Sequence, residues 1–289
     1  MTTTNSISRI IEKIDPELSI NRISPQHGGD INDAFFVETN KEPLFIKTNS
    51  GVPKDFFEKE AMGLEELRST GAVNVPNVLL YNQETENEQY LVLSYVSGNK
   101  EPATEAKLGQ QLARMHQVTK SFYGLPYSNY LGTFQQESGE YEKWVDFYRE
   151  KRLLPQIEIA VKKGYLKAAQ KERHLQLLTR LEEWIPADPG ASVLHGDLWG
   201  GNWIAGNKGE PYLIDPAVIY GDREMDLAMT ALFGGFGSSF YKTYEAESNS
   251  KLNQEIWPLY QLLYLYMHLN SFGVSYLGAT ERIVQRFLG

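Results

Sequence analysis

The stretch SVLHGDLWGGNWIAGNKGEPYLIDP, residues 192–216, decides the fold because it gathers acidic, amide and glycine residues between two apolar runs. His195 and Asp197 end the first run, Asn202 follows Asp197 by five positions, and Asp215 closes the second run. Three interpretations compete for this pattern. It could be a metal-dependent hydrolase site, a phosphoryl-transfer site, or a hairpin whose Asp and Asn side chains only stabilise turns.

The spacing between Asp197 and Asn202 favours phosphoryl transfer. It equals that of the kinase catalytic loop, in which the Asp accepts the proton of the substrate hydroxyl and the Asn binds Mg²⁺. Asp215, on the adjoining strand, would be the second magnesium ligand, since Mg²⁺ prefers oxygen ligands. The hydrolase interpretation stays open, although the histidines other than His195 lie far away along the chain. The presence of both Asn202 and Asp215 disfavours the turn interpretation.

A kinase site also needs a lysine on an upstream strand and a glutamate on the helix that follows it. Lys47 ends the apolar run LFIK, and Glu60 lies in the helix expected over residues 53–70. Glu60 is four residues from Phe56 and four from Leu64, which places it on the apolar face. A carboxylate on a buried face needs a partner. We therefore predict a Lys47–Glu60 ion pair that holds the phosphates of a nucleotide.

Two further segments complete the expected nucleotide site. The turn HGGDIN, residues 27–32, lies between two expected strands, and its backbone N–H groups would cover the phosphates. It lacks the G-x-G-x-x-G pattern, and its candidate residues are Gly28, Gly29 and Asn32. The run LSYVSG, residues 93–98, is the expected hinge. Its main chain would contact adenine at Ser94 and Val96, so ATP and Mg²⁺ are the expected cofactors.

The hydrophobic pattern predicts an α+β chain with two lobes. Apolar spacing predicts strands over residues 33–39, 43–48 and 90–96, and helices over residues 6–15 and 53–70. After Gly98 the pattern becomes helical, over residues 105–118, 141–161 and 171–184. We expect residues 1–95 to form a nucleotide-binding lobe with a small antiparallel sheet and a helix. Residues 96–289 would form a larger, mainly helical lobe that holds the catalytic loop and the acceptor.

Composition excludes several classes of protein. The net charge of −9 over 289 residues argues against a nucleic-acid partner. The absence of cysteine excludes disulfides, thiolate metal sites and a cysteine nucleophile. The first residues, MTTTNSISRI, do not resemble a signal peptide, and the apolar run at residues 258–273 is too short to span a membrane. We expect a cytoplasmic protein without a membrane partner.

Four segments closely resemble the fructosamine kinases, also called ketosamine-3-kinases. They are HGDLWGGNW (195–203), residues 214–244, FYREKRLLPQI (147–157) and LGQQLARMHQ (108–117). The most specific marks are Trp199 inside the catalytic loop and the run FGGFGSSFY, residues 233–241. The family belongs to the aminoglycoside- and choline-kinase-like group, so the resemblance, which covers nearly the whole chain, implies a protein-kinase-like fold.

The resemblance implies ATP-dependent phosphorylation of the 3-hydroxyl of a ketosamine, the adduct of a reducing sugar with a free amine or a protein lysine. Phosphorylation makes the adduct unstable, which would be a deglycation activity. Asp197 would orient and deprotonate the hydroxyl, and Trp199 would lie against the sugar. His268 matches a family position near the acceptor pocket, although a histidine on a helix face is an equal alternative. Further family-like positions, expected to brace the catalytic loop or build the lobe, are Asp222, Asp226, Arg152 and Gln156.

Other interpretations stay open. Ser94 stands where the family commonly has an acidic hinge residue, and FQQES at residues 134–138 departs from the family pattern. An aminoglycoside- or choline-type phosphotransferase would use the same catalytic residues. A nucleotide-binding pseudoenzyme is the alternative from another class, but the catalytic set, from Lys47 to Asp215, is intact. The sequence does not determine the sugar, the amine, the acceptance of whole glycated proteins or the oligomeric state.

Overall fold

A five-stranded antiparallel sheet begins the chain in the computed structural model, which describes residues 3–26, 31–82, 88–234 and 236–289. Its strands lie in the order β1-β2-β3-β5-β4, and the expected strands are confirmed. They are β1 (Ile20–Gln26), β2 (Asp33–Thr39), β3 (Leu44–Asn49), β4 (Val78–Tyr81) and β5 (Gln89–Ser94). The predicted glycine turn, with Gly28 and Gly29, falls outside the described residues.

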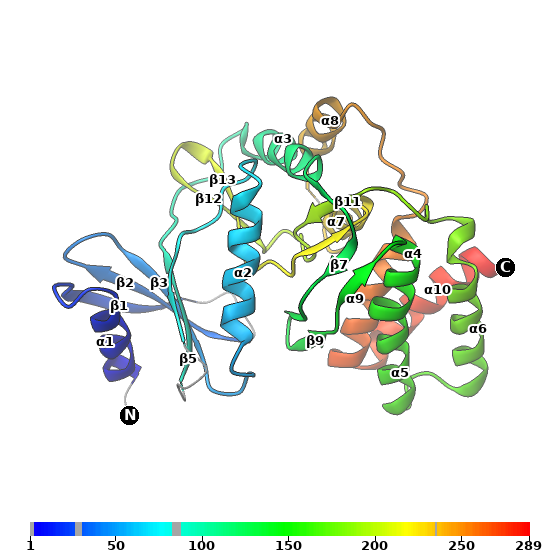
Figure 1. Cartoon of the computed structure of the whole chain (residues 1–289), viewed down its shortest axis with the longest axis horizontal. Coiled ribbons are helices and arrows are strands. Elements are labelled where there is room, and N and C mark those ends of the chain that lie inside the picture. Colours follow the sequence, from blue (N-terminus) through cyan, green and yellow to red (C-terminus); the bar gives the residue numbers. More distant parts are fainter. Residues whose placement is uncertain (1–2, 27–30, 83–87, 235) are drawn as a thin grey trace.

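Two helices flank this sheet (Figure 1). Helix α1 (Thr3–Ile14) packs Ile7, Ile10 and Ile11 against Val37 and other apolar residues of one face. This spacing of three and four residues is what an amphipathic helix requires. Helix α2 (Phe56–Ser69) stands between the sheet and the rest of the chain. The helices expected over residues 6–15 and 53–70 are therefore both present.

The second lobe contains most of the helices (Figure 1). They are α3 (Thr104–His116), α4 (Trp144–Phe147), α5 (Leu154–Lys162), α6 (Ala168–Thr179), α7 (Glu224–Leu232), α8 (Ser238–Ser248), α9 (Trp257–Phe272) and α10 (Leu277–Leu288). None of the helices that the structure describes is long and apolar enough to cross a membrane.

The helix expected over residues 141–161 is interrupted by a π-helical turn, Tyr148–Leu153, between α4 and α5. Pro155 has no N–H group, so it cannot donate to the carbonyl of Lys151 in the way a regular helix requires. The guanidinium of Arg152 donates to that carbonyl instead, at 2.9 Å. The proline and the arginine together explain the interruption.

A second five-stranded sheet in this lobe, in the order β10-β7-β14-β11-β6, was not predicted. Its strands are β6 (Thr119–Lys120), β7 (Tyr123–Leu125), β10 (Gly139–Tyr141), β11 (Ala191–Leu194) and β14 (Ile219–Gly221). Two hairpins accompany it, β8 (Asn129–Leu131) with β9 (Phe134–Gln136), and β12 (Trp203–Ala205) with β13 (Pro211–Leu213). Strands of two to four residues are too short to show alternation in the sequence. The lobe is therefore less purely helical than expected.

Helix α2 packs directly on the second lobe. A side-chain carbon added at Gly63 would lie only 3.2 Å from the ring of Pro216, so a glycine permits the close approach. At the start of the helix, the rings of Phe56 and Tyr130 are 5.1 Å apart. Consequently Glu60, on α2, lies beside the segment that carries Asp215.

Candidate active site

Lys47, Glu60 and Asp215 meet between the two lobes. Lys47 projects from β3, and its Nζ lies 2.7 Å from Glu60 Oε1. The same ammonium donates to Asp215 Oδ1, which lies 168 positions further along the chain. The predicted Lys47–Glu60 ion pair is confirmed, and Asp215 joins it.

The Lys47 ammonium is buried and held between two carboxylates. Burial alone would lower the pKa of Lys47, but the charges of Asp215 and Glu60 outweigh it and raise the pKa above its ordinary value. The lysine therefore stays positively charged. A buried charge is tolerated only with such partners, and the result is a fixed cation beside an accessible carboxylate.

Asp215 has an unusual backbone conformation. Its φ is 55°, in the left-handed region that non-glycine residues rarely adopt. The turn is held by its neighbour Ile214, whose N–H donates to the carbonyl of Asn202 at 3.0 Å and whose carbonyl lies 2.9 Å from His195 Nε2. Strained residues of this kind gather at functional sites. The Asp215 side chain is 44% exposed, so it remains reachable by a ligand.

The catalytic loop turns sharply after β11. Gly196 has a φ of 81°, and a side-chain carbon there would lie 2.0 Å from the carbonyl oxygen of Ala217, so only glycine fits. Asn202 Nδ2 then donates to the backbone carbonyl of Asp197 at 2.8 Å and to its carboxylate at 3.1 Å. The five-residue spacing read from the sequence thus brings Asn202 onto Asp197.

The pKa of the Asp197 carboxyl is shifted toward neutral pH. Burial raises its pKa to about 7, with smaller contributions from the charges of Asp215 and Asp226, while the hydrogen bond from Asn202 acts against the rise. A general base works best when its pKa is near the working pH. Asp197 therefore has the properties of a group that accepts a proton from a hydroxyl.

Asp226 braces the catalytic loop, as expected. Its two oxygens accept from the N–H groups of His195 (2.7 Å) and Gly196 (2.8 Å). The same carboxylate lies 3.2 Å from His116 Nε2. Burial disfavours its charge, but the hydrogen bond from His116 leads the interactions that hold the pKa of Asp226 below its ordinary value. A charged Asp226 thus fixes the loop.

The expectation that Asp222 also braces the catalytic loop is wrong. Its carboxylate accepts from the N–H of Glu224 at 3.0 Å and from the hydroxyl of Tyr260 at 2.6 Å. These contacts lie at the start of α7, so Asp222 binds the first N–H group of that helix and ties the helix to α9. Position at a helix start explains the difference, because the nearest free N–H groups belong to the helix itself.

Sequence reasoning missed three residues that support the loop. His116, at the end of α3, contacts Asp226, and the hydroxyl of Tyr244 lies 2.8 Å from the other ring nitrogen of His116. Tyr264, on α9, donates its hydroxyl to the carbonyl of Gly196 at 2.8 Å. Each comes from a different helix far along the chain, so no local spacing could reveal them.

Asn202 and Asp215 fit a magnesium site. The Asn202 amide nitrogen already donates to Asp197, which leaves the amide oxygen for a cation. One Asp215 oxygen contacts Lys47, and the carboxylate is partly exposed. Mg²⁺ commonly binds one or two such oxygen ligands together with substrate phosphates and water. The donor set therefore suits this ion.

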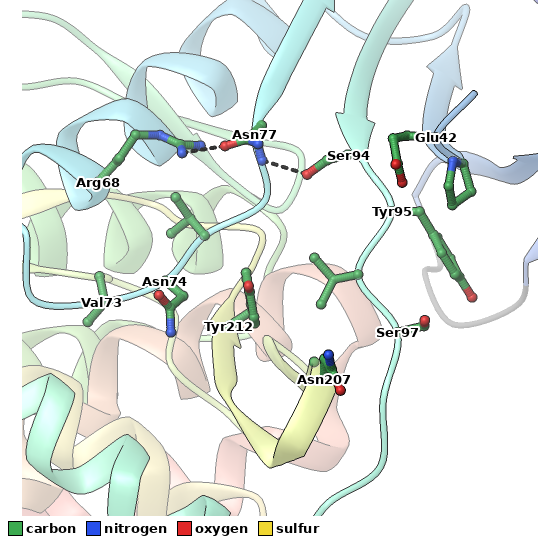
Figure 2. A pocket seen from close by; sticks show the side chains of 14 residues that line it. Glu42, Arg68, Val73, Asn74, Asn77, Ser94, Tyr95, Ser97, Asn207 and Tyr212 are labelled. Carbon is green, nitrogen blue, oxygen red and sulfur yellow. Dashed lines mark hydrogen bonds between the residues drawn. The ribbon is translucent and has the colours of Figure 1, made fainter.

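The expected hinge borders a cavity of about 580 Å³. Ser94 donates its N–H to the Asn77 carbonyl at 2.9 Å, and its hydroxyl accepts from the Asn77 N–H at 2.8 Å. Figure 2 shows this contact beside Arg68 and above Tyr212. Lys47 and the catalytic loop are not among the residues that line the cavity. Since the Ser94 N–H is engaged, Val96 is the better candidate for adenine.

The other predicted residues take different positions. The side chain of Asn32 accepts from Asn49 Nδ2 at 2.9 Å. Trp199, within the catalytic loop, is 40% exposed. Arg152 is buried, and burial lowers its pKa to about 9. Gln156 is also buried and accepts from Asn270. Arg152 and Gln156 therefore contribute to the structure of the lobe.

The profile of the fructosamine kinases matches residues 2–289. The chain belongs to the fructosamine kinase family. A probable ketoamine kinase of Enterococcus faecium is 34% identical over 280 residues, which is 96% of this chain and 99% of that protein. The chloroplastic protein-ribulosamine 3-kinase of Arabidopsis thaliana is 32% identical over 274 residues, covering 93% of this chain and 83% of that one.

Solved structures agree with this assignment. A crystal structure from Thermobifida fusca, provisionally described as a fructosamine-3-kinase, has a TM-score of 0.87 and 25% identity, covering 97% of this chain and 98% of that one. An aminoglycoside phosphotransferase has a TM-score of 0.64 at 17% identity, covering 98% and 99% of the two chains. The second likeness concerns the fold alone. Together they confirm the expected kinase-like fold.

Proposed function

We propose that this fructosamine kinase family member transfers the γ-phosphoryl group of ATP to the 3-hydroxyl of a ketosamine. One observation carries the proposal. The Lys47–Glu60–Asp215 cluster and the Asp197–Asn202 pair come together at one place in a chain of this family. Phosphoryl transfer needs a fixed cation, oxygen ligands for magnesium and a base near the hydroxyl.

Each group then has a separate role. The Asp197 carboxylate orients the acceptor hydroxyl and takes its proton as the oxygen attacks. The Lys47 ammonium, held by Glu60, attracts the phosphates of the nucleotide. Asn202 and Asp215 would hold Mg²⁺, which when bound neutralises charge on the phosphates. The nucleotide would lie on the lobe of residues 1–95, with Val96 at adenine, and the acceptor on residues 96–289.

The identity of the acceptor rests on the family. The Arabidopsis relative is named as a kinase of protein-bound ribulosamine, so a ribulosamine on a lysine is our first candidate. Trp199 and His268 would contact the acceptor beside the catalytic loop. A cytoplasmic location is part of the proposal, whereas the Arabidopsis relative is chloroplastic.

The alternatives have less support. An aminoglycoside- or choline-type activity would use the same catalytic groups, but the relatives by sequence are ketoamine and ribulosamine kinases. The pseudoenzyme interpretation is disfavoured by the assembled set of Lys47, Glu60, Asp197, Asn202 and Asp215. The hydrolase interpretation is disfavoured because the relatives named above are kinases.

The position of phosphorylation tests the proposal. The protein is incubated with ATP, Mg²⁺ and ribulosyl-lysine, and the product is examined by ³¹P and ¹³C NMR. We expect phosphate on the 3-oxygen of the sugar, and no product with Asp197→Asn. Phosphate on another oxygen would contradict the regiochemistry. Because an unstable 3-phosphate decays to inorganic phosphate and the free amine, release of inorganic phosphate without release of lysine would contradict the transfer reaction.

A further inference from the structure

Trp203 lies between the two residues that would hold magnesium. It follows Asn202 directly in the chain, and in the β12–β13 hairpin it pairs with Leu213, two residues before Asp215. The N–H of Ile214 donates to the carbonyl of Asn202 at 3.0 Å, which continues the pairing toward both ligands. A displacement of Trp203 would therefore move Asn202 relative to Asp215.

The side chain of Trp203 is held by two others, and we call the three residues the Trp203 stack: Lys100, Trp203 and Phe236. Trp203 is buried, with 4% of its surface exposed. The Phe236 ring is stacked on the indole, with centroids 5.9 Å apart and planes inclined by 23°. The Lys100 ammonium lies over the indole, 3.8 Å from the ring centroid. Offset aromatic pairs and cation–π contacts are both attractive, so the indole is fixed in one position.

The two contacts of the indole come from distant parts of the chain. Lys100 lies just after the hinge, and Phe236 belongs to the run of residues 233–241, one of the most specific marks of the family. The N–H of Gly237 donates to Glu105 Oε2 on α3 at 2.9 Å, which fixes this run on the second lobe. The indole therefore connects the hinge and the family-specific run to the strand that follows Asn202.

The Asn202 side chain is anchored through its nitrogen. Nδ2 donates to the Asp197 carbonyl at 2.8 Å and to the Asp197 carboxylate at 3.1 Å. With the nitrogen held there, the direction of Oδ1 depends on where the backbone of Asn202 lies. That backbone continues into Trp203, which the stack holds in place. The two anchors together determine where the amide oxygen points.

We propose that Trp203 is a positioning residue for the metal ligand Asn202. The stack holds strand β12 so that Asn202 Oδ1 keeps its place relative to the carboxylate of Asp215, and both oxygens are ready for a cation. Trp203 acts through Asn202. This inference rests on the proposed function and deepens it, because it gives Lys100 and Phe236 a part in organising the metal site.

Binding of Mn²⁺ to the protein saturated with AMP-PNP, followed by electron paramagnetic resonance, tests the inference without turnover. The variants are Trp203→Leu, Trp203→Phe and Lys100→Met. Lys100 is exposed, so its substitution by a methionine removes the charge without disturbing the core. That variant decides the question even if Trp203→Leu does not fold. KM for ribulosyl-lysine is measured in parallel.

Trp184→Leu is the matched control. The Trp184 ring is contacted by the Arg180 guanidinium, 5.4 Å from the ring centroid, and by the Phe287 ring at 5.1 Å. This combination of a cation, an indole and a phenylalanine resembles the Trp203 stack, but it packs on α10 and includes no neighbour of Asn202 or Asp215. The control should keep the wild-type affinity for Mn²⁺.

We expect Trp203→Leu to raise the Kd for Mn²⁺ about tenfold, the lower end of the range for groups that orient a metal ligand. Lys100→Met should raise it about two- to fivefold, as for the loss of an exposed cation–π contact. Trp203→Phe retains an aromatic ring and should keep most of the affinity. KM for ribulosyl-lysine should stay near the wild-type value in all three variants.

Wild-type affinity for Mn²⁺ in both Trp203→Leu and Lys100→Met would overturn the positioning role and leave the kinase function intact. A loss of the same size in Trp184→Leu, or a proportional rise in KM for ribulosyl-lysine, would indicate general damage to the lobe and would overturn it too. A wild-type protein that binds no Mn²⁺ together with AMP-PNP would instead overturn the magnesium site and the proposed function.

Discussion

Lys47 Nζ lies 2.7 Å from Glu60 Oε1, and the two side chains are only 8% and 11% exposed. Strand β3 supplies the lysine and helix α2 the glutamate, so the contact joins the sheet to the helix that follows it. Asp215 completes the cluster from the other lobe. These three residues therefore link the fold to the proposed binding of a nucleotide.

Replacing Glu60 by Gln should weaken nucleotide binding. The variant leaves Lys47 with Asp215 as its single carboxylate partner, which draws the ammonium away from the phosphates. We expect KM for ATP to rise about tenfold, and the free energy of unfolding to fall by about 1–3 kcal/mol, as for a lost buried hydrogen bond to a charge. Kinetics and thermal unfolding measure the two effects.

Glu65→Gln is the matched control on the same helix. Glu65 is 55% exposed and pairs with Arg68 at 3.3 Å. Exposed pairs contribute about 0–1 kcal/mol, so this variant should leave KM for ATP unchanged. An equal effect of both substitutions would show that the helix responds to any loss of charge, and would remove the special role of Glu60.

Asp197→Asn should abolish catalysis while nucleotide binding persists. The amide cannot take the proton of the hydroxyl, and loss of a general base reduces kcat by about 10²- to 10⁴-fold. Single-turnover kinetics and calorimetric titration with Mg·ATP separate the two properties. Turnover similar to wild type would mean that another group accepts the proton.

The rate should depend on pH through Asp197. Its pKa is raised to about 7, so in the free enzyme the carboxyl is protonated below that pH and cannot act as a base. We expect kcat/KM for ATP to rise with pH through about 7 and to level off above it, because this parameter reports the free enzyme. A profile that stays flat between about pH 5.5 and 8 would contradict the assignment.

Two tyrosine contacts anchor helix α2 to the second lobe. The Tyr130 hydroxyl donates to Asp55 at 2.7 Å near the start of the helix, and the Tyr220 hydroxyl donates to Glu66 at 3.0 Å near its end. The double substitution Tyr130→Phe with Tyr220→Phe should speed amide hydrogen exchange in α2 and raise KM for ATP, because Glu60 would be less firmly held against Lys47.

Tyr141→Phe provides the control for this experiment. Its hydroxyl donates to Glu150 at 2.9 Å on the surface of the second lobe, away from α2. The same chemical change there should alter neither the exchange of α2 nor the KM for ATP. If the double variant behaves like the control, packing alone fixes the helix and the hydroxyl groups are dispensable.

Local patterns in the sequence were sufficient to predict much of the candidate active site. The five-residue spacing placed Asn202 on Asp197, and the helical spacing around Glu60 turned its carboxylate toward Lys47. The second follows from the periodicity of a helix, and the first from the residue spacing of the kinase catalytic loop. Strands β2, β3 and β5 of the first sheet were also predictable, because they show apolar runs.

Long-range contacts were not predictable in this way. His116, Tyr244 and Tyr264 support the catalytic loop from three separate helices, and their sequence neighbours give no sign of it. The short strands of the second sheet show no alternation, since each has only two to four residues. Asp222 was misassigned because a helix start and a loop brace look alike in sequence.

ATP consumption with Mg²⁺ against ribulosyl-lysine, fructosyl-lysine, kanamycin and choline tests the proposed reaction most directly. We predict turnover on at least one of the two sugar–lysine adducts, and loss of that turnover in Asp197→Asn. Turnover on kanamycin or choline alone would contradict the ketosamine acceptor. Binding of ATP without turnover on any of the four would contradict the kinase itself.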